Sequence, residues 1–202
     1  MTANRPAYLK ESPSQTAGPY VHIGCTPNAV GIEGVFPQDL GAGSPAGPAA
    51  QGERITLTGC VWDGAGWALR DCMVETWQAD ASGRHPGQPG ADPAVSGFAR
   101  RAADPQTGEW SVETVKPGPV PALGGLMAPH VAIWIVARGI NLGLHTRCWF
   151  DDEADANALC PVLSRIEQRN RAPTLLARRE RSGVYRFDIR LQGDRETVFF
   201  DV

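Results

Sequence analysis

The chain has 202 residues, 42% of them hydrophobic, and a formal net charge of −3 at pH 7. This length and apolar content predict one large domain with a substantial core, and the 23 glycines and 17 prolines favour a loop-rich, all-β architecture. The small net charge argues against a nucleic-acid-binding surface, and no apolar stretch approaches the roughly 20 residues of a membrane-spanning helix.

The N-terminal residues 1–24 show neither helical nor strand periodicity, and they lack the apolar region of a signal peptide. Ser12 and Gly18 each precede a proline, which restricts them to extended conformations, and Tyr20 then begins a short apolar run. These features predict an ordered, extended arm, with a flexible terminus as the alternative. Residues 25–202 are expected to form a single domain.

Two further features concern the compartment and the surface of the protein. Five cysteines form an odd number without CxxC spacing, which favours reduced thiols and a cytoplasmic location. Residues 41–52 have a low-complexity composition of Gly, Ala, Pro and Ser, which predicts a mobile surface loop. A domain linker is the alternative for this segment, but the chain before it is too short to build its own core.

After residue 53, alternating apolar residues predict a series of strands. The expected strands are residues 55–61, 73–79, 98–102, 109–115, 130–137, 144–150, 185–191 and 198–200. Turn residues at 63–66 predict a hairpin after the first strand, and turn residues at 104–108 predict a second hairpin that joins residues 98–102 and 109–115. Helical spacing within residues 155–180 predicts two short helices. The whole pattern is typical of a β-sandwich of two sheets with a short helical insertion, and its function is expected in the loops.

The longest apolar run, residues 130–137, is apolar on both faces of a strand. A strand of this kind is usually central to a sheet that is covered on both sides. We therefore expect His130 at the mouth of a buried strand and residues 144–150 beside it. Trp134 is expected in the core, where its replacement by alanine costs roughly 3–5 kcal/mol.

The histidines at positions 22, 85, 130 and 145 do not have the spacing of a metal site. Ala132 shares a strand face with His130 and Val120 lies in a turn, but neither can coordinate a metal. A hydrogen-bonded structural role is therefore expected for each histidine taken alone. The acidic residues 151–155 are expected to be solvated carboxylates at the start of a helix.

Arg138 differs from the other arginines because it ends the apolar strand and precedes a glycine. Its planar guanidinium could bind the carboxylate of a ligand, or it could form a salt bridge with a neighbouring acid of the fold. Position alone does not separate these two interpretations.

Several long and specific stretches, spread almost from end to end, resemble the intradiol ring-cleaving dioxygenases. The matching stretches are SQTAGPYVHIG (14–24), WQAD (77–80), KPG (116–118), MAPH (127–130), ARGIN (137–141), LHTR (144–147), FDDE (150–153), YRFDI (185–189) and ETVFFD (196–201). The resemblance is to one subunit of a two-subunit enzyme. It implies a β-sandwich that assembles with a homologous beta subunit into an oligomer of such pairs.

The resemblance also implies an activity and a cofactor. The partner would hold Fe(III) through two tyrosines and two histidines, and the pair would cleave protocatechuate with O2 to 3-carboxy-cis,cis-muconate. At the four ligand positions, this chain carries His85, Val120, His130 and Ala132. Because two nitrogen donors without phenolates suit Fe(III) poorly, these residues are interpreted as a vestigial site, and the chain alone is expected to be inactive.

By the same resemblance, this chain contributes substrate-binding residues to the pocket of its partner. These residues are Thr16, Gly18, Pro19, Tyr20 and Arg138. An alternative is a non-catalytic β-sandwich module that binds a small carboxylate or another protein. A third hypothesis, a self-sufficient enzyme that uses His85 and His130, has the weakest support from ligand chemistry.

Overall fold

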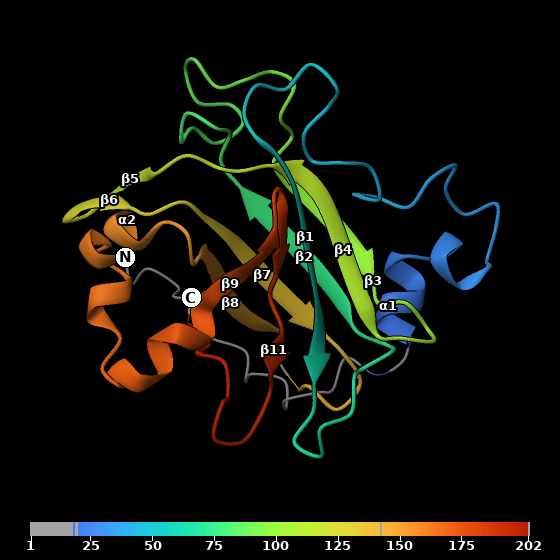
Figure 1. Ribbon diagram of the computed structural model, residues 1–202. Coiled ribbons are helices and arrows are strands. Elements are labelled where there is room, and N and C mark those ends of the chain that lie inside the picture. Colours follow the sequence, from blue (N-terminus) through green and yellow to red (C-terminus); the bar gives the residue numbers. More distant parts are fainter. Residues whose placement is uncertain (1–17, 19, 142, 202) are drawn as a thin grey trace, which may run out of the picture.

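The computed structural model describes Gly18, residues 20–141 and residues 143–201, and it shows a protein built mainly of strands (Figure 1). In chain order, the elements are α1 (Tyr20–Cys25), η1 (Asn28–Val30), β1 (Arg54–Trp62), β2 (Met73–Gln78), β3 (Phe98–Ala102), β4 (Glu109–Val115), β5 (Val120–Ala122), β6 (Gly125–Met127), β7 (His130–Val136), β8 (Leu144–Phe150), α2 (Ala154–Leu159), η2 (Leu163–Arg165), η3 (Arg169–Leu175), β9 (Leu176–Arg181), β10 (Val184–Arg186) and β11 (Ile189–Arg190). The predicted all-β sandwich is confirmed.

Two groups of strands face each other across the core. One is the antiparallel group β3-β2-β7-β8, and the other contains β4, β1, β10 and β11. Strand β9 joins them, because it is antiparallel to β10 and pairs in parallel with the end of β8. The short hairpin β5-β6 lies outside this arrangement. The central position predicted for residues 130–137 is confirmed, since β7 lies between β2 and β8.

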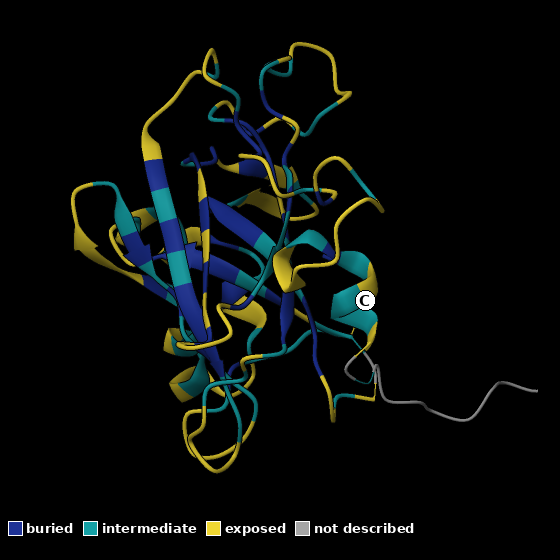
Figure 2. Ribbon diagram, turned by 90° about the vertical axis from the view of Figure 1, so that its right-hand side faces the viewer, coloured by how far each residue is buried: buried dark blue, intermediate teal, exposed yellow. Residues whose placement is uncertain are grey.

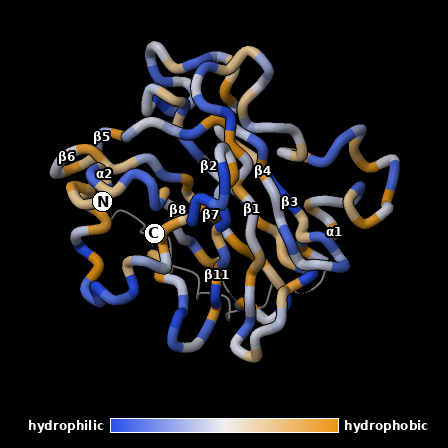
Figure 3. Tube along the Cα trace, in the orientation of Figure 1, coloured by the Kyte–Doolittle hydropathy of each residue, from blue (hydrophilic) through white to orange (hydrophobic). Residues whose placement is uncertain are grey.

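The main core fills the space between the two groups of strands. Side chains that point inward from β1, β2, β4, β7 and β8 are almost fully buried. In Figure 2, buried residues are dark blue and gather along the strands. Hydrophobic and hydrophilic residues alternate along the strands (Figure 3), as expected when one face of a sheet covers a core. A second cluster, which includes Trp149, Cys160 and Leu175, lies between the outer face of β8 and the helical segments.

The predicted hairpin between residues 98–102 and 109–115 is wrong, although its turn forms. The carboxylate of Asp104 accepts backbone N–H groups from Gln106 and Thr107, as a tight turn requires. The flanking strands nevertheless diverge, because β3 pairs with β2 whereas β4 pairs with β1. The turn at Asp63, by contrast, closes a short hairpin in which Trp62 forms an antiparallel bridge with Ala68, before the chain enters β2 in the other group of strands. Turn chemistry is local, but the choice of a pairing partner is not.

The extended conformation predicted through residue 24 is also wrong, because Tyr20–Cys25 form α1. A proline restricts the residue before it and permits a helix to begin directly after it, which explains the helix at this point. The guanidinium of Arg100 on β3 donates to the carbonyl of Cys25 and so connects α1 to the sheet. Residues 1–17 and 19, the rest of the predicted arm, lie outside the described residues.

The C-terminal third differs from the prediction in three places. The helical pattern holds for α2, η2 and η3, but residues 176–180 belong to strand β9. The strand expected at 185–191 is interrupted at Phe187, which bonds to Thr58, and at Asp188, whose carboxylate accepts the N–H of Cys60. Residues 198–200 contribute only a single bridge between His145 and Phe200.

Residues 41–52 contain no helix, and their only strand-like pairing is the bridge of Ala46 with Val95, but they are held in place at several points. The hydroxyl of Ser44 donates to the carbonyl of Glu113 on β4 at 2.6 Å. Ala46 is buried against Val95 and Val115 in a small hydrophobic cluster. The loop is therefore irregular, as predicted, but it is anchored to the sandwich. Within the described part of the chain, no helix is long and apolar enough to cross a membrane.

Candidate functional site

The outer face of β7 and its neighbours carries the residues predicted as a vestigial site. Because side chains alternate, His130, Ala132 and Trp134 share this face, while the residues between them point into the core. Strand pairing places Ala132 between Trp77 of β2 and Arg147 of β8. In the next row along the strands, Trp134 lies between Glu75 and His145, and at the opposite end His130 pairs with Trp149.

His130 is a buried, uncharged histidine. Only 6% of it is exposed, its Nδ1 lies 2.9 Å from the carbonyl oxygen of Ala128, and its ring stacks on Trp149 at 5.6 Å. Burial lowers the pKa of His130 to about 4 and outweighs the hydrogen bond to Ala128, which acts in the opposite direction, while the nearby Arg147 and His85 add smaller contributions that also lower it. The expected position at the mouth of a buried strand is confirmed, and the imidazole is neutral at ordinary pH.

Replacing His130 with asparagine is expected to make the fold less sensitive to acid. The unfolded chain protonates this histidine near pH 6.5, whereas the folded protein does so near pH 4. Between these values the unfolded state binds more protons, so stability is lost as the pH falls through this window, by about 3 kcal/mol at most. Urea unfolding at pH 7, 6 and 5 measures the effect. A stability difference between wild type and His130→Asn that stays constant with pH contradicts the expectation, and His145→Asn is the control.

His85 lies in the loop after β2, where it stacks on Trp77 with ring centroids 5.7 Å apart and nearly parallel planes. Its Nδ1 is buried and has no hydrogen-bond partner among the described residues. Val120 is 8% exposed and pairs with Met127, whose sulfur lies 3.3 Å from a guanidinium nitrogen of Arg147. Arg147 therefore lies opposite one of the four predicted positions, Ala132, and contacts the methionine that pairs with another, Val120.

This set of groups does not fit a ferric ion. It offers two imidazoles, an isopropyl group, a methyl group and a guanidinium, but no anionic oxygen donor, which Fe(III) prefers. The cation of Arg147 also opposes the binding of a metal ion at this place. Among the described residues, no group of three or more His, Cys, Asp or Glu side chains is placed to hold a metal.

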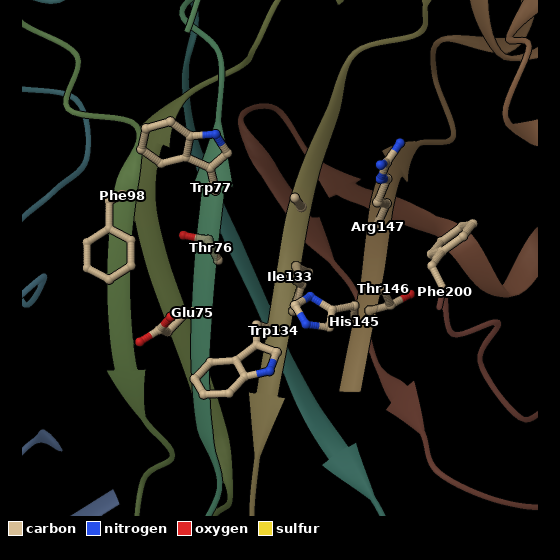
Figure 4. A pocket seen from close by; sticks show the side chains of 11 residues that line it. Glu75, Thr76, Trp77, Phe98, Ile133, Trp134, His145, Thr146, Arg147 and Phe200 are labelled. Carbon is tan, nitrogen blue, oxygen red and sulfur yellow. The ribbon is translucent and has the colours of Figure 1, made fainter. Parts of the chain in front are cut away.

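Beside this site the outer face opens into a pocket of about 210 Å³ (Figure 4). Its lining combines aromatic rings with a few polar side chains: Glu75, Thr76, Trp77, Phe98, Ala132, Ile133, Trp134, His145, Thr146, Arg147 and Phe200. In Figure 4, Trp77 and Arg147 extend from strands on either side of β7, and Trp134 closes one end. Trp134 is thus only half-buried, and its predicted place in the core is wrong.

The pocket includes Arg147, for which the sequence predicts no role. The sequence shows only that Arg147 shares a strand face with His145, on a strand that is expected to pair with β7. What the sequence could not supply was the register of that pairing. A shift of one residue would have turned Arg147 into the core.

Some of the residues predicted to reach the pocket of the partner subunit are among the described residues, and these lie at the surface. Arg138 follows β7, its side chain is 69% exposed, and its Nε forms an ion pair with Asp71 at 3.1 Å. The salt bridge with a neighbouring acid, one of the two interpretations of Arg138, is therefore present. Tyr20 begins α1 and is 80% exposed, and Gly18 has a left-handed backbone with φ of 64°. Thr16 and Pro19 lie outside the described residues.

Comparison with known proteins gives a family. A family model described as dioxygenase matches residues 38–193. The chain is 51% identical over 197 residues to the protocatechuate 3,4-dioxygenase alpha chain of Pseudomonas putida, with 96% of this chain and 97% of that protein covered. It is 44% identical to the alpha chain of the Burkholderia cepacia enzyme, with 96% and 98% covered.

Two more distant similarities complete the comparison. The beta chain of the Burkholderia cepacia enzyme is 39% identical over 75 residues, or 35% of this chain and 32% of that one. Catechol 1,2-dioxygenase from Pseudomonas arvilla C-1 shares the fold, with a TM-score of 0.57 and 20% identity over 76% of this chain and 56% of that one. The family model matches most of the chain, and about half of the residues are identical to those of an alpha chain that is matched over almost its whole length. The chain therefore belongs to the dioxygenase family that includes the alpha chains of protocatechuate 3,4-dioxygenase.

Proposed function

We propose that this chain is the alpha subunit of a heteromeric protocatechuate 3,4-dioxygenase. Together with its beta subunit, it uses O2 to cleave the ring of protocatechuate between the two hydroxylated carbons, and the product is 3-carboxy-cis,cis-muconate. The observation that carries the proposal is the identity of 51% with an alpha chain over almost the whole length of both proteins. Residues 1–24 contribute to the interface with the beta subunit, and residues 25–202 form one domain.

The ferric ion of this enzyme is held by the beta subunit. The lack of fit between Fe(III) and the surroundings of His85, Val120, His130 and Ala132 supports this division of labour. The beta subunit then supplies the metal chemistry, and this chain supplies walls of the substrate pocket. A cytoplasmic location agrees with the five cysteines, all of which have free thiols and four of which are buried.

Arg138 is suited to receive the carboxylate of the substrate. In its ion pair with Asp71, the arginine is 69% exposed and the aspartate 23%. Pairs whose arginine is open to solvent contribute only about 0–1 kcal/mol, so the guanidinium can exchange this partner for a ligand at little cost. Tyr20, an exposed aromatic side chain, is suited to burial in a partner. Thr16, Gly18 and Pro19 are proposed to complete this wall, where glycine allows close approach and proline limits the loss of freedom.

Metal content tests the division between the subunits. The purified chain is expected to bind no stoichiometric iron and to leave protocatechuate unchanged, whereas the complex with its beta subunit contains iron and consumes substrate and O2. Iron and turnover in the isolated chain would overturn the proposal. Failure to form a complex with a beta-type chain would instead favour a non-catalytic binding module.

Replacing Arg138 with alanine is expected to raise the KM of the assembled enzyme about 10-fold or more, because a hydrogen bond to a charged group contributes about 1.5–3 kcal/mol. The melting temperature should stay close to that of the wild type, since the side chain is 69% exposed. Steady-state kinetics and thermal melts measure both quantities. Arg178→Ala, which removes an arginine with a similarly exposed ion pair to Glu180, is the control. Equal KM values for both variants would contradict the role of Arg138.

A further inference from the structure

The pocket on the outer face exists because a small residue stands at its centre. Ala132 has Trp77 on one side and Arg147 on the other, each on a neighbouring strand. Adjacent strands lie about 4.8 Å apart, so the two flanking backbones are separated by about 10 Å. A methyl group cannot fill this width, which leaves a gap above Ala132 between a large indole and a guanidinium.

The size and walls of this gap suit one aromatic ring. Its volume of about 210 Å³ is below the roughly 300–1,000 Å³ of pockets that hold drug-sized ligands. Trp77, Phe98, Trp134 and Phe200 supply aromatic surface around it. Aromatic rings favour other rings through stacked or edge-on contacts, so a planar ligand matches these walls better than a branched aliphatic one.

The charge of the pocket favours an anion. Arg147 is only half-exposed, and no carboxylate of the described residues lies within ion-pair distance of it. Its recorded contacts are the sulfur of Met127, a weak acceptor, and the ring of Phe200 at 5.6 Å. The acid of the pocket, Glu75, is already paired with Arg100 at 2.6 Å. The guanidinium thus keeps the donors that a carboxylate binds in a bidentate manner.

We infer that this pocket binds a planar aromatic carboxylate, with the ring above Ala132 and between the aromatic walls and the carboxylate on Arg147. The ligand class follows from the pocket itself, and the inference does not depend on the roles proposed for Arg138 and the N-terminal segment. The small side chain of Ala132 thus leaves room for an organic anion at a place whose residues do not fit a metal ion.

Binding of benzoate to the purified complex of this chain with its beta subunit tests the inference. Equilibrium dialysis gives the number of benzoate molecules per complex, and quenching of tryptophan fluorescence reports on Trp77 and Trp134. Arg147→Gln should weaken one benzoate per copy of this chain about 10-fold or more, since a charged hydrogen bond is lost. Ala132→Leu should remove the same benzoate by filling the gap, without a change of charge. Arg178→Gln, on β9 and outside the pocket, should leave the binding unchanged.

Two results would overturn the inference. One is a benzoate stoichiometry and affinity that neither Arg147→Gln nor Ala132→Leu alters. The other is a wild-type complex in which benzoate is excluded because the beta subunit covers the pocket. In both cases iron content and turnover of protocatechuate by the same wild-type complex show whether the proposed function still holds, so the two failures are distinguishable. If the Arg147→Gln chain does not assemble with the beta subunit, benzoate binding by the Ala132→Leu complex alone tests the inference.

Discussion

Lys116→Met is expected to lower the free energy of unfolding by about 3 kcal/mol, because it removes the cation that is paired with Asp152 and Glu153, and of these two carboxylates Asp152 keeps a longer ion pair, to Arg179 at 3.4 Å. The Lys116 side chain is 11% exposed, and its Nζ lies 3.0 Å from Asp152 and 2.6 Å from Glu153. Nζ also lies over the rings of Phe150 and Tyr185, at 5.2 and 5.4 Å from their centroids. A methionine fills the same space but offers neither a charge nor a donor.

The protonation of this cluster shows why the ion pairs matter. Burial alone would lower the pKa of Lys116, but its hydrogen bonds to Glu153, Asp152 and Tyr185 outweigh burial and raise the pKa above its usual value. Burial alone would raise the pKa of Asp152, yet the hydrogen bonds from Tyr185 and Lys116 lower it. A carboxylate with a lowered pKa contributes stability above its unfolded pKa of about 3.9, and this contribution is lost as the pH falls below that value.

Urea unfolding of the wild type and of Lys116→Met at pH 7 measures the effect. Arg178→Met is the matched control, because it breaks an ion pair whose arginine is 71% exposed, and such pairs contribute about 0–1 kcal/mol. A loss of less than 1 kcal/mol for Lys116→Met would contradict the expectation.

The sequence predicts solvated carboxylates at a helix start for the acidic stretch 151–155. The helix does begin at Ala154, but Asp152 and Glu153 face Lys116.

The sequence predicted the elements of the fold better than their pairing. An apolar run such as residues 130–137 defines a strand by itself, because burial on both faces removes the need for polar side chains. The partners of a strand are distant in sequence, and the hairpin expected between β3 and β4 failed for that reason. Asp104 forms the turn that its sequence dictates, but β4 pairs with β1, whose residues lie about 50 positions away.

The candidate site shows the same limit. His130 was correctly expected to be buried, because its neighbours in the strand are apolar. Its surroundings depend on register, which brings Arg147 opposite Ala132 and places Trp134 on the open side of the sheet. The sequence contains no local signal for what covers an outer face, so Trp134 and the core tryptophans could not be separated before the structure.

Trp110→Ala is expected to cost about 3–5 kcal/mol of stability, the range typical of removing a large core aromatic. Trp110 is 1% exposed and lies on β4 opposite Gly59 of β1. Gly59 makes room for it, because a Cβ at this position would lie 3.2 Å from the indole and would overlap the carbonyl of Phe187. The space left by the indole is enclosed by two strands and has little freedom to collapse.

Trp134→Ala is the matched comparison, since it removes the same side chain from the open face of the same sandwich. Half-burial predicts a loss of about 1 kcal/mol, well below that for Trp110→Ala. Denaturant unfolding of the two variants and the wild type measures both losses. Equal losses would mean that Trp134 is covered in solution by a part of the protein or by a second copy. In that case the pocket above Ala132 is closed in the isolated chain and opens to a ligand only after that cover is displaced.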